Sequence, residues 1–392
     1  MNFAPVELDE TSAAFRAEVA AFCDERVTEA VLEDEWATGD GHNAGLHRAL
    51  GAHGWVVPTW ATDRGGAGLT PLQASILDRE LRMRHAPSIT RGTTLLVLDA
   101  VEAYGSDRLK DEVLPGVAAG EICFCLGYTE PDAGSDLAAA RTRAVPSGDN
   151  WVINGQKMFT TGAQHCQYAF LVTRTNPDVP KHQGLTMFLC PLDRATVQPV
   201  GTLGGERTNM VFFDDHRISD HYRLGDVDGG WAVLMGPLDA EHGFGDRATP
   251  PLEHRGGLYG RPNVDALRIA AAWASAPGRD GRRPINDAIT RRRLARMALN
   301  VEAMSVAPGP MGRILSADLF IRNGADLMDL LGAESLLPHG APGAVGDGWI
   351  EYCHRFAQGT STYGGTTELH RNIIAERILG LPRSTPTERN GT

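Results

Sequence analysis

The hydrophobic pattern changes twice along this chain, and that change limits the folds open to it. Up to about residue 120, apolar residues recur at helical spacing, as Phe15, Val19 and Phe22 do. Between about residues 121 and 228, short β-type runs separated by Pro and Gly replace the helical pattern, which then returns. The sequence therefore predicts an α+β fold with an N-terminal helical domain, a central β domain and a C-terminal helical bundle, over residues 1–120, 121–228 and 229–392.

Local turn signals add detail to this division. Asn154-Gly155 stands between Trp151–Ile153 and Lys157–Phe159, which predicts a hairpin with a primed turn. Sequence rich in Gly and Pro predicts loops over Gly243–Asn263 and Ser275–Arg283. A long loop that directly follows a helix either shapes a site or is disordered, and the pattern leaves both interpretations open.

Composition and charge exclude several classes of protein. The chain has 392 residues, of which 42% are hydrophobic, so it can form a substantial core. Its net charge is −12 and its densest basic patch is Arg291–Arg293, which argues against a nucleic-acid partner. No apolar run approaches the roughly 20 residues that cross a bilayer, and the first residues lack a secretory pattern, so we expect a cytoplasmic protein without a membrane partner. The six cysteines have no zinc-type spacing, which predicts reduced, mostly buried thiols and no metal site.

Two motifs carry the most specific information. Residues 128–136 read Tyr-Thr-Glu-Pro-Asp-Ala-Gly-Ser-Asp, and residues 361–372 read Ser-Thr-Tyr-Gly-Gly-Thr-Thr-Glu-Leu-His-Arg-Asn. Together with the order of helical, β and helical domains, they closely resemble the acyl-CoA dehydrogenases over nearly the whole chain. The resemblance implies an FAD-dependent enzyme that places a double bond next to the carbonyl of an acyl thioester. It also implies an electron-transfer flavoprotein, or a similar acceptor, as the redox partner.

The chain departs from the family at the position of the catalytic base. In much of the family a glutamate follows the tyrosine of the late motif, where this chain has Gly364. Some members carry the glutamate at the end of the helix after the β domain, and Glu241 occupies that place here. It continues an apolar stripe that runs from Trp231 to Leu238, so it is expected to face inward, where lost hydration raises the pKa of a carboxyl. The resemblance therefore predicts that Glu241 removes the α-proton; the alternative is a partly exposed glutamate at a helix end.

The resemblance also assigns contacts with the cofactor and the substrate. In the family the segment that matches Leu126–Ser135 lies along the flavin, where fixed donors stabilise the charge that arrives with a hydride. An acidic Pro-Asp-Ala-Gly turn alone would explain only part of this match. The residues implied to contact FAD are Leu126, Tyr128, Thr129, Gly134, Ser135, Phe159, Thr161, Thr366, Thr367 and Glu368. Those implied to contact the acyl thioester are Ser135, Asp239, His242 in place of the usual arginine, Gly364, and Gly365, whose N–H would hold the carbonyl.

The sequence leaves alternatives open for the subunit arrangement and for the type of reaction. Family members are usually homotetramers or dimers, in which a neighbouring subunit completes the flavin site through Arg-x-x-Phe and Gln-x-x-Gly-Gly segments. Here Gly278–Gly281 and Asp329–Ala333 depart from both patterns, so a hetero-oligomer with a related subunit is an alternative. Gly364 alone would suit a supporting subunit, and the same fold can also carry a flavin monooxygenase or oxidase. The glycine pair leaves room for a bulky acyl group, whose identity and carrier, CoA or acyl carrier protein, the sequence does not give.

Overall fold

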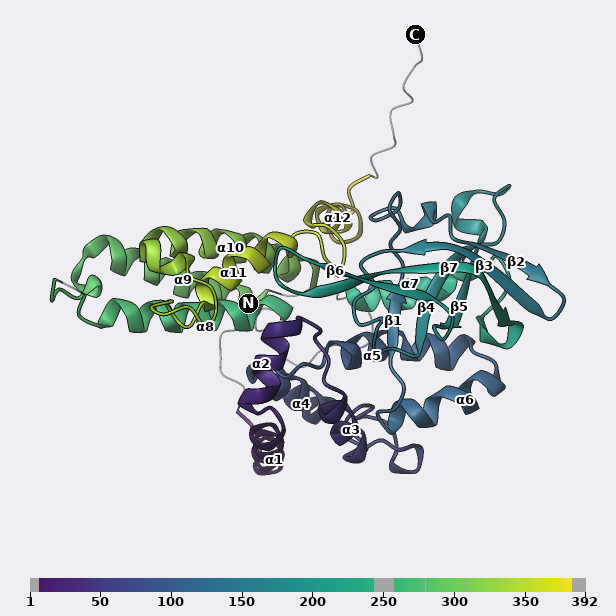
Figure 1. The fold of residues 1–392 in the computed structure, drawn as a ribbon, viewed down its shortest axis with the longest axis horizontal. Helices are drawn as coiled ribbons and strands as arrows, with labels where there is room; N and C mark the ends of the chain where they lie inside the picture. Colours follow the sequence, from purple (N-terminus) through teal and green to yellow (C-terminus); the bar gives the residue numbers. More distant parts are fainter. Residues whose placement is uncertain (1–6, 243–256, 279, 308, 383–392) are drawn as a thin grey trace, which may run out of the picture. The chain divides into compact units, whose positions relative to one another are not determined.

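In the computed structural model, the chain forms two compact units, over residues 4–253 and 254–392 (Figure 1). The described residues are 7–242, 257–278, 280–307 and 309–382. The first unit holds helices followed by a sheet and one more helix, and the second unit is helical. The predicted α+β class, with helical, β and helical parts in that order, is confirmed.

Helices α1 to α6 precede the sheet, and most of them begin at a capping side chain. In four of them the residue before the helix accepts a hydrogen bond from the first turn, at Asp9, Thr28, Asn43 and Ser106. A capping box at Thr70 begins the fourth helix. The bounds are α1 (Glu10–Arg26), α2 (Glu29–Thr38), α3 (Ala44–Ala52), α4 (Pro71–Met83), α5 (Ile89–Tyr104) and α6 (Asp107–Ala118).

The apolar stripe predicted for the first helix is buried. Phe15 and Phe22 both meet Trp55 edge to face, with ring centroids 5.8 and 5.1 Å apart. Val19 lies between them on the same face of α1 and is fully buried. Aromatic pairs of this kind stabilise a core by about 0.5–1.5 kcal/mol beyond the burial of their area. The helical spacing read from the sequence therefore identifies the face that holds α1 in place.

An eight-stranded, mostly antiparallel sheet follows these helices. The strand order is β6-β7-β3-β2-β4-β5-β8, and β1 pairs in parallel with β4. Figure 1 shows α5 and α6 along one side of this sheet. The bounds are β1 (Phe124–Gly127), β2 (Arg143–Ser147), β3 (Asn150–Lys157), β4 (Tyr168–Arg174), β5 (Leu185–Pro191), β6 (Thr196–Gly201), β7 (Arg207–Ser219) and β8 (Arg223–Leu224).

The hairpin predicted at Asn154-Gly155 is wrong. Strand β3 continues through this dipeptide, and the turn between β2 and β3 lies at Gly148-Asp149. Gly155 instead marks a bulge, where the register between β3 and β7 shifts and φ is +145°. A Cβ at this position would lie 2.7 Å from Oγ1 of Thr142, so the glycine is needed for a close approach inside the sheet.

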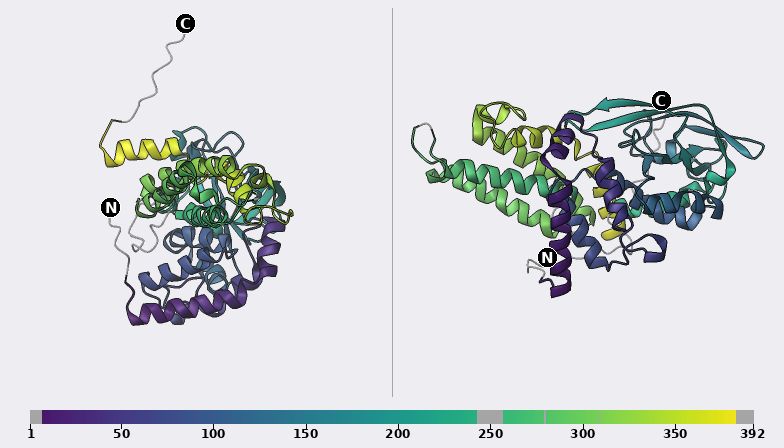
Figure 2. Two further views of the ribbon diagram at one scale, coloured as in Figure 1. Left: turned by 90° about the vertical axis from the view of Figure 1, so that its left-hand side faces the viewer. Right: turned by 60° about the horizontal axis from the view of Figure 1, so that its bottom comes forward.

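The second unit is a bundle of helices, drawn in further views in Figure 2. Helices α8, α9 and α11 all pack against α10. Tyr259, Phe320 and Phe356 form the aromatic centre of the bundle, with ring centroids 6.0 to 6.3 Å apart. The bounds are α8 (Gly257–Ser275), α9 (Ala288–Val306), α10 (Gly309–Leu331), α11 (Trp349–Gly359) and α12 (Thr367–Ile373), which continues into a π-helical turn (Ile374–Ile378).

The loop predicted over Gly243–Asn263 is wrong at its end, because α8 already begins at Gly257. Asn263 is buried there, donates to the carbonyl oxygen of Tyr259 at 3.0 Å, and accepts from Nδ2 of Asn323 at 3.0 Å. Such buried contacts outweigh the weak helix propensity of Gly and Pro in this stretch. Residues 243–256 lie outside the described residues. No helix in the described part of the chain combines the length and the apolar character that crossing a bilayer requires.

Candidate active site

The first motif lies where the chain leaves β1. Tyr128 is buried and Thr129 is half-buried. A tight turn over Glu130–Ala133 follows, closed by two backbone hydrogen bonds of 2.9 and 3.1 Å. Beyond the turn, Gly134 and Ser135 are exposed. The hydroxyls of Thr129 and Ser135 make no hydrogen bond to another described residue, so both are open to a bound group.

A buried ion pair fixes this turn. Nζ of Lys157 donates to Glu130 at 2.7 Å and to the carbonyl oxygen of Tyr128 at 3.2 Å. The Glu130 carboxylate also accepts from the N–H groups of Arg141 and Thr142 at 2.7 and 2.9 Å. Burial lowers the pKa of Lys157 to about 8, although Glu130 counteracts it. Burial alone would raise the pKa of Glu130, but the charge of Lys157 and the hydrogen bonds outweigh burial and lower it. Both groups are therefore charged at neutral pH.

The segment around Phe159 is tied to the first motif. The N–H of Met158 donates to the carbonyl oxygen of Thr129 at 2.8 Å. Phe159 itself is 56% exposed and has a left-handed backbone with φ of +56°, which costs a bulky residue about 1 kcal/mol or more. Thr161 is half-buried and donates to the hydroxyl of Thr208 at 3.1 Å. A strained, exposed aromatic side chain beside open hydroxyl groups is suited to packing against a planar ligand.

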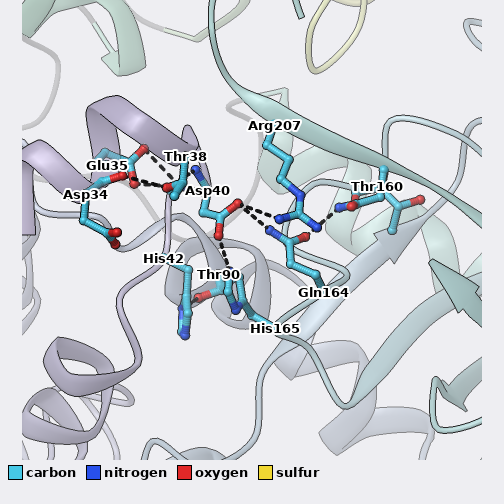
Figure 3. Close-up of polar contacts among 12 residues, drawn as sticks. Asp34, Glu35, Thr38, Asp40, His42, Thr90, Thr160, Gln164, His165 and Arg207 are labelled. Atoms are coloured by element: carbon cyan, nitrogen blue, oxygen red, sulfur yellow. Dashed lines mark hydrogen bonds and ion pairs between the residues drawn. The ribbon is translucent and has the colours of Figure 1, made fainter. Parts of the chain in front are cut away.

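A carboxylate from the helical part holds the turn that follows Phe159. Figure 3 shows Asp40, two residues after α2, between Arg207 on one side and His165 on the other. Its oxygens accept from Nε2 of Gln164 at 3.1 Å, Nε2 of His165 at 3.0 Å and Nη1 of Arg207 at 3.3 Å. The three donors lie on segments far from Asp40 in sequence, so this side chain joins the helices to the sheet.

The same network reaches the backbone of the turn. Nδ2 of Asn209 donates to Oε1 of Gln164 at 2.7 Å and to the carbonyl oxygen of Thr160 at 3.0 Å. The N–H of Arg207 donates to the carbonyl oxygen of Gly39 at 2.8 Å. Gly39 has φ of +61°, and a Cβ there would lie 2.2 Å from a carbonyl oxygen of the β6–β7 turn. Only glycine fits this contact without movement of the backbone.

Helix α7 (Gly230–Glu241) places Glu241 at its last residue. The helix packs against α5 and β5. Of the predicted stripe, Leu234 and Leu238 are buried, whereas Trp231 and Met235 are half-buried. Glu241 follows three residues after Leu238 and is itself half-buried. The carboxylate therefore belongs to the edge of the core.

Tyr128 connects this helix end to the first motif electrostatically. Its hydroxyl is buried and has no hydrogen-bond partner among the described residues. Burial, followed by the negative charge of Glu241, raises the pKa of Tyr128 well above its usual value. Asp239 and His242 are half-buried at the same helix end, and the strand residue Leu126 is half-buried too.

The late motif lies in the second unit and begins with two left-handed glycines. Gly364 and Gly365 have φ of +56° and +83°. The carbonyl oxygen of Gly364 accepts a hydrogen bond from Nε2 of His370 at 3.1 Å. Burial lowers the pKa of His370, so its ring is neutral at physiological pH. Glycine adopts both of these φ angles without strain.

The three polar residues after the glycines begin the last helix. Thr366 is the N-cap of α12, and its hydroxyl accepts from the N–H of Leu369 at 3.1 Å. Thr367 is buried, whereas Glu368 is exposed and pairs with Arg371 at 3.3 Å. The structure thus groups the assigned residues in two sets. One set belongs to the first unit, and the late motif belongs to the second unit.

The polar groups of the first unit suit a flavin. The free hydroxyls of Thr129 and Ser135 can donate to the polar edge of a ring system, and Phe159 offers its exposed face. The turn that separates Thr129 from Ser135 is held by the buried pair of Glu130 and Lys157, so it is fixed before a ligand binds. The fold and this donor set together define a flavoprotein of the dehydrogenase type.

Sequence comparison identifies the family. Models of three acyl-CoA dehydrogenase domains match the chain: the N-terminal domain over residues 9–121, the middle domain over 125–216 and the C-terminal domain over 306–379. The chain belongs to the acyl-CoA dehydrogenase family, whose members are FAD-dependent oxidoreductases.

Individual relatives extend over almost the whole length. Acyl-CoA dehydrogenase FadE26 from Mycobacterium tuberculosis is 30% identical over 378 residues, which cover 90% of this chain and 91% of the relative. The ChsE4-ChsE5 complex from Mycobacterium tuberculosis contains a chain of 28% identity with a TM-score of 0.83, covering 97% of this chain and 100% of that one. The Tcur3481-Tcur3483 steroid ACAD contains one of 27% identity with a TM-score of 0.82, covering 98% and 100%.

Proposed function

We propose that this protein oxidises a bulky acyl-CoA thioester at the α,β bond, with Glu241 as the base that removes the α-proton. One observation carries the proposal: a half-buried glutamate ends α7, three residues beyond the buried Leu238. The late motif has Gly364 where many relatives carry their glutamate. A dehydrogenase with this sequence therefore needs a base elsewhere, and Glu241 supplies a carboxylate at an alternative family position.

The roles of the chain's own residues follow from their surroundings. An α-proton next to a thioester is weakly acidic, so its removal needs a carboxylate with little competing hydration, which the edge of the core provides. Tyr128 stays a neutral phenol and cannot replace Glu241 as an acceptor. Thr129 and Ser135 would hold the polar edge of FAD, and Phe159 would pack against its ring. When bound, FAD supplies the acceptor for the hydride that leaves the β-carbon.

The substrate is proposed to be a polycyclic, steroid-type acyl group carried by CoA. The glycine pair at Gly364-Gly365 has no side chain to limit the size of an acyl group. One structural relative is named a steroid ACAD, and the sequence relative FadE26 is named an acyl-CoA dehydrogenase. In this proposal the N–H of Gly365 donates to the thioester carbonyl, while Asp239 and His242 contact the ligand. An electron-transfer flavoprotein or similar protein then accepts the electrons.

A hetero-oligomer is proposed for the assembly. Gly278–Gly281 and Asp329–Ala333 lack the residues with which family members complete a neighbouring flavin site. The ChsE4-ChsE5 complex supports this idea, because its name gives two different partners. The competing function is that of a supporting subunit without a base of its own, which Gly364 would suit. A half-buried glutamate at the end of α7 favours an active subunit.

Anaerobic mixing with acyl-CoA substrates tests the reaction directly. We expect a steroid-type acyl-CoA to bleach the absorbance of the bound oxidised flavin, and Glu241→Gln to retain FAD but lose bleaching. Glu121→Gln, at an exposed glutamate, is the matched control and should behave as the unmodified protein. Bleaching by Glu241→Gln at the unmodified rate would rule out Glu241 as the base. Rapid reaction of the reduced flavin with oxygen would instead favour an oxidase or monooxygenase.

A further inference from the structure

Two histidines and a cysteine from separate segments meet inside the first unit. His42 lies two residues before α3, His47 lies on α3, and Cys123 lies just before β1. One ring nitrogen of each histidine and the sulfur of Cys123 all lie within 4.8 Å of one another. His47 and Cys123 are buried, with 3% of each exposed, and His42 is half-buried. We propose that these three side chains form a binding site for one divalent metal ion of the Zn²⁺ class.

The spacing of the donors is close to that of a tetrahedral site. Zinc–sulfur bonds of about 2.3 Å and zinc–nitrogen bonds of about 2.0 Å place two ligands of one ion roughly 3.5 Å apart. Sγ of Cys123 and Nε2 of His47 are 3.2 Å apart. Closing the remaining separations needs a shift of about 1 Å, which the half-buried ring of His42 can make. Three protein ligands leave a fourth position for water, as in zinc sites that keep an open position.

The chemistry of the donors suits this class of ion. A neutral imidazole offers the lone pair of one ring nitrogen to a metal ion. Cys123 is one of six free, buried cysteines. Two imidazoles and a thiolate favour zinc and related transition metals over the hard ions Mg²⁺ and Ca²⁺. On binding, the Cys123 thiol transfers its proton to solvent as the metal–sulfur bond forms, and no group changes oxidation state.

Neighbouring residues support the donors. Nδ1 of His42 lies 2.6 Å from Oγ1 of Thr90, a contact that orients the ring. The ring of His165 lies against that of His42, with centroids 4.7 Å apart, and is held in turn by Asp40 (Figure 3).

Arg91, a cation in the same unit, is already paired. It is buried. Its guanidinium is already engaged, because it donates to Asp78 at 2.5 Å and to the carbonyl oxygen of Trp55 at 2.9 Å. The charge of Arg91 is therefore largely neutralised by a carboxylate. On the other side, an oxygen of Asp40 lies 3.0 Å from Nε2 of His165, whose ring packs against that of His42.

Metal titration of the purified holoprotein tests the site. The protein is stripped with a chelator, mixed with Zn²⁺ or Co²⁺, desalted and analysed for metal content. We expect one equivalent of Zn²⁺ per chain and a raised midpoint of thermal unfolding. Co²⁺ should give absorption in the red, where oxidised flavin does not absorb, with the intensity of a tetrahedral site. Neither readout needs enzyme activity, so the result is independent of the role proposed for Glu241.

Variants separate this site from adventitious binding. Cys123→Ser and His42→Gln should each weaken Zn²⁺ binding by about 100-fold or more, since each removes one ligand. Cys23→Ser, at another buried thiol of the same unit, is the matched control and should keep the full equivalent. His42 is half-buried, so its variant remains informative if Cys123→Ser fails to fold. No retained metal in the unmodified protein, or equal binding by His42→Gln, would overturn the proposal.

Discussion

Replacing Lys157 with methionine should destabilise the first unit more than removing any charged side chain from its surface. The ammonium group is fully buried and donates to Glu130 and to the carbonyl oxygen of Tyr128. Methionine fills a similar volume but leaves the Glu130 carboxylate buried without its cation. Removing one member of a buried ion pair leaves the other charge unpaired and lowers the free energy of unfolding by about 3–5 kcal/mol. Two backbone N–H donors still bind Glu130, so the lower end, about 3 kcal/mol, is expected.

Urea unfolding, monitored by circular dichroism, measures the stability of Lys157→Met, Glu130→Gln and the double variant. A loss of about 3 kcal/mol corresponds to a fall in the thermal midpoint of roughly 6–12 °C for a unit of this size. Because the double variant no longer buries a lone charge, it should recover about 2 kcal/mol relative to the sum of the single changes. Lys181→Met is the control, since the pair of Lys181 with Asp136 is half exposed. A loss below about 1 kcal/mol, or strict additivity, would refute the reasoning.

Three further changes test other features. Burial raises the pKa of Glu35 to about 7, from 4.5, so this group contributes stability below about pH 4.5 that is lost as the pH rises through 7. Glu35→Gln should therefore raise the free energy of unfolding in urea by about 1 kcal/mol at about pH 8 and by almost nothing at about pH 5. An equal effect at both pH values would contradict this assignment of the Glu35 pKa. Phe159→Gly should change the free energy of unfolding of the FAD-free protein by less than about 1 kcal/mol, because the side chain is exposed and its backbone is strained. The same variant should retain less FAD on gel filtration, whereas a loss of stability above about 3 kcal/mol would show that the side chain belongs to the core. Gly364→Glu should cost about 1–2 kcal/mol, because φ is +56°, and reduce turnover of bulky acyl thioesters more than short ones; an unchanged preference would refute the space argument.

Periodicity predicted the helical and β segments because each segment follows one spacing. The face of α1 is an example, since Phe15, Val19 and Phe22 are buried as the helical spacing indicates. Turn chemistry was less reliable. Asn154-Gly155 has the composition of a hairpin turn, but its surroundings use Gly155 for a bulge against Thr142. A short motif cannot reveal a neighbour that lies on another strand, so the local interpretation failed there.

The site was predictable only where a sequence motif identifies its residues. The two signature segments and Glu241 came from resemblance, and their assigned contacts with FAD and substrate stay predictions. The contacts of Asp40 with Gln164, His165 and Arg207 had no sequence signal, because they join residues far apart in the chain. The buried position of Lys157 had no sequence signal either, because a lysine at the end of a strand is usually exposed. Long-range pairing is what single-sequence patterns do not encode.

The contact between Asp40 and Arg207 also bears on the order of events during synthesis. The two residues are 167 positions apart, so the carboxylate emerges from the ribosome long before its guanidinium partner. During that interval Asp34, Glu35 and Asp40 are close in sequence and lack this compensating cation, so the newly made helical segment should dock only once β7 has been translated. Nascent chains arrested before β7 would accordingly be more open to proteases around Asp40 than chains arrested after it.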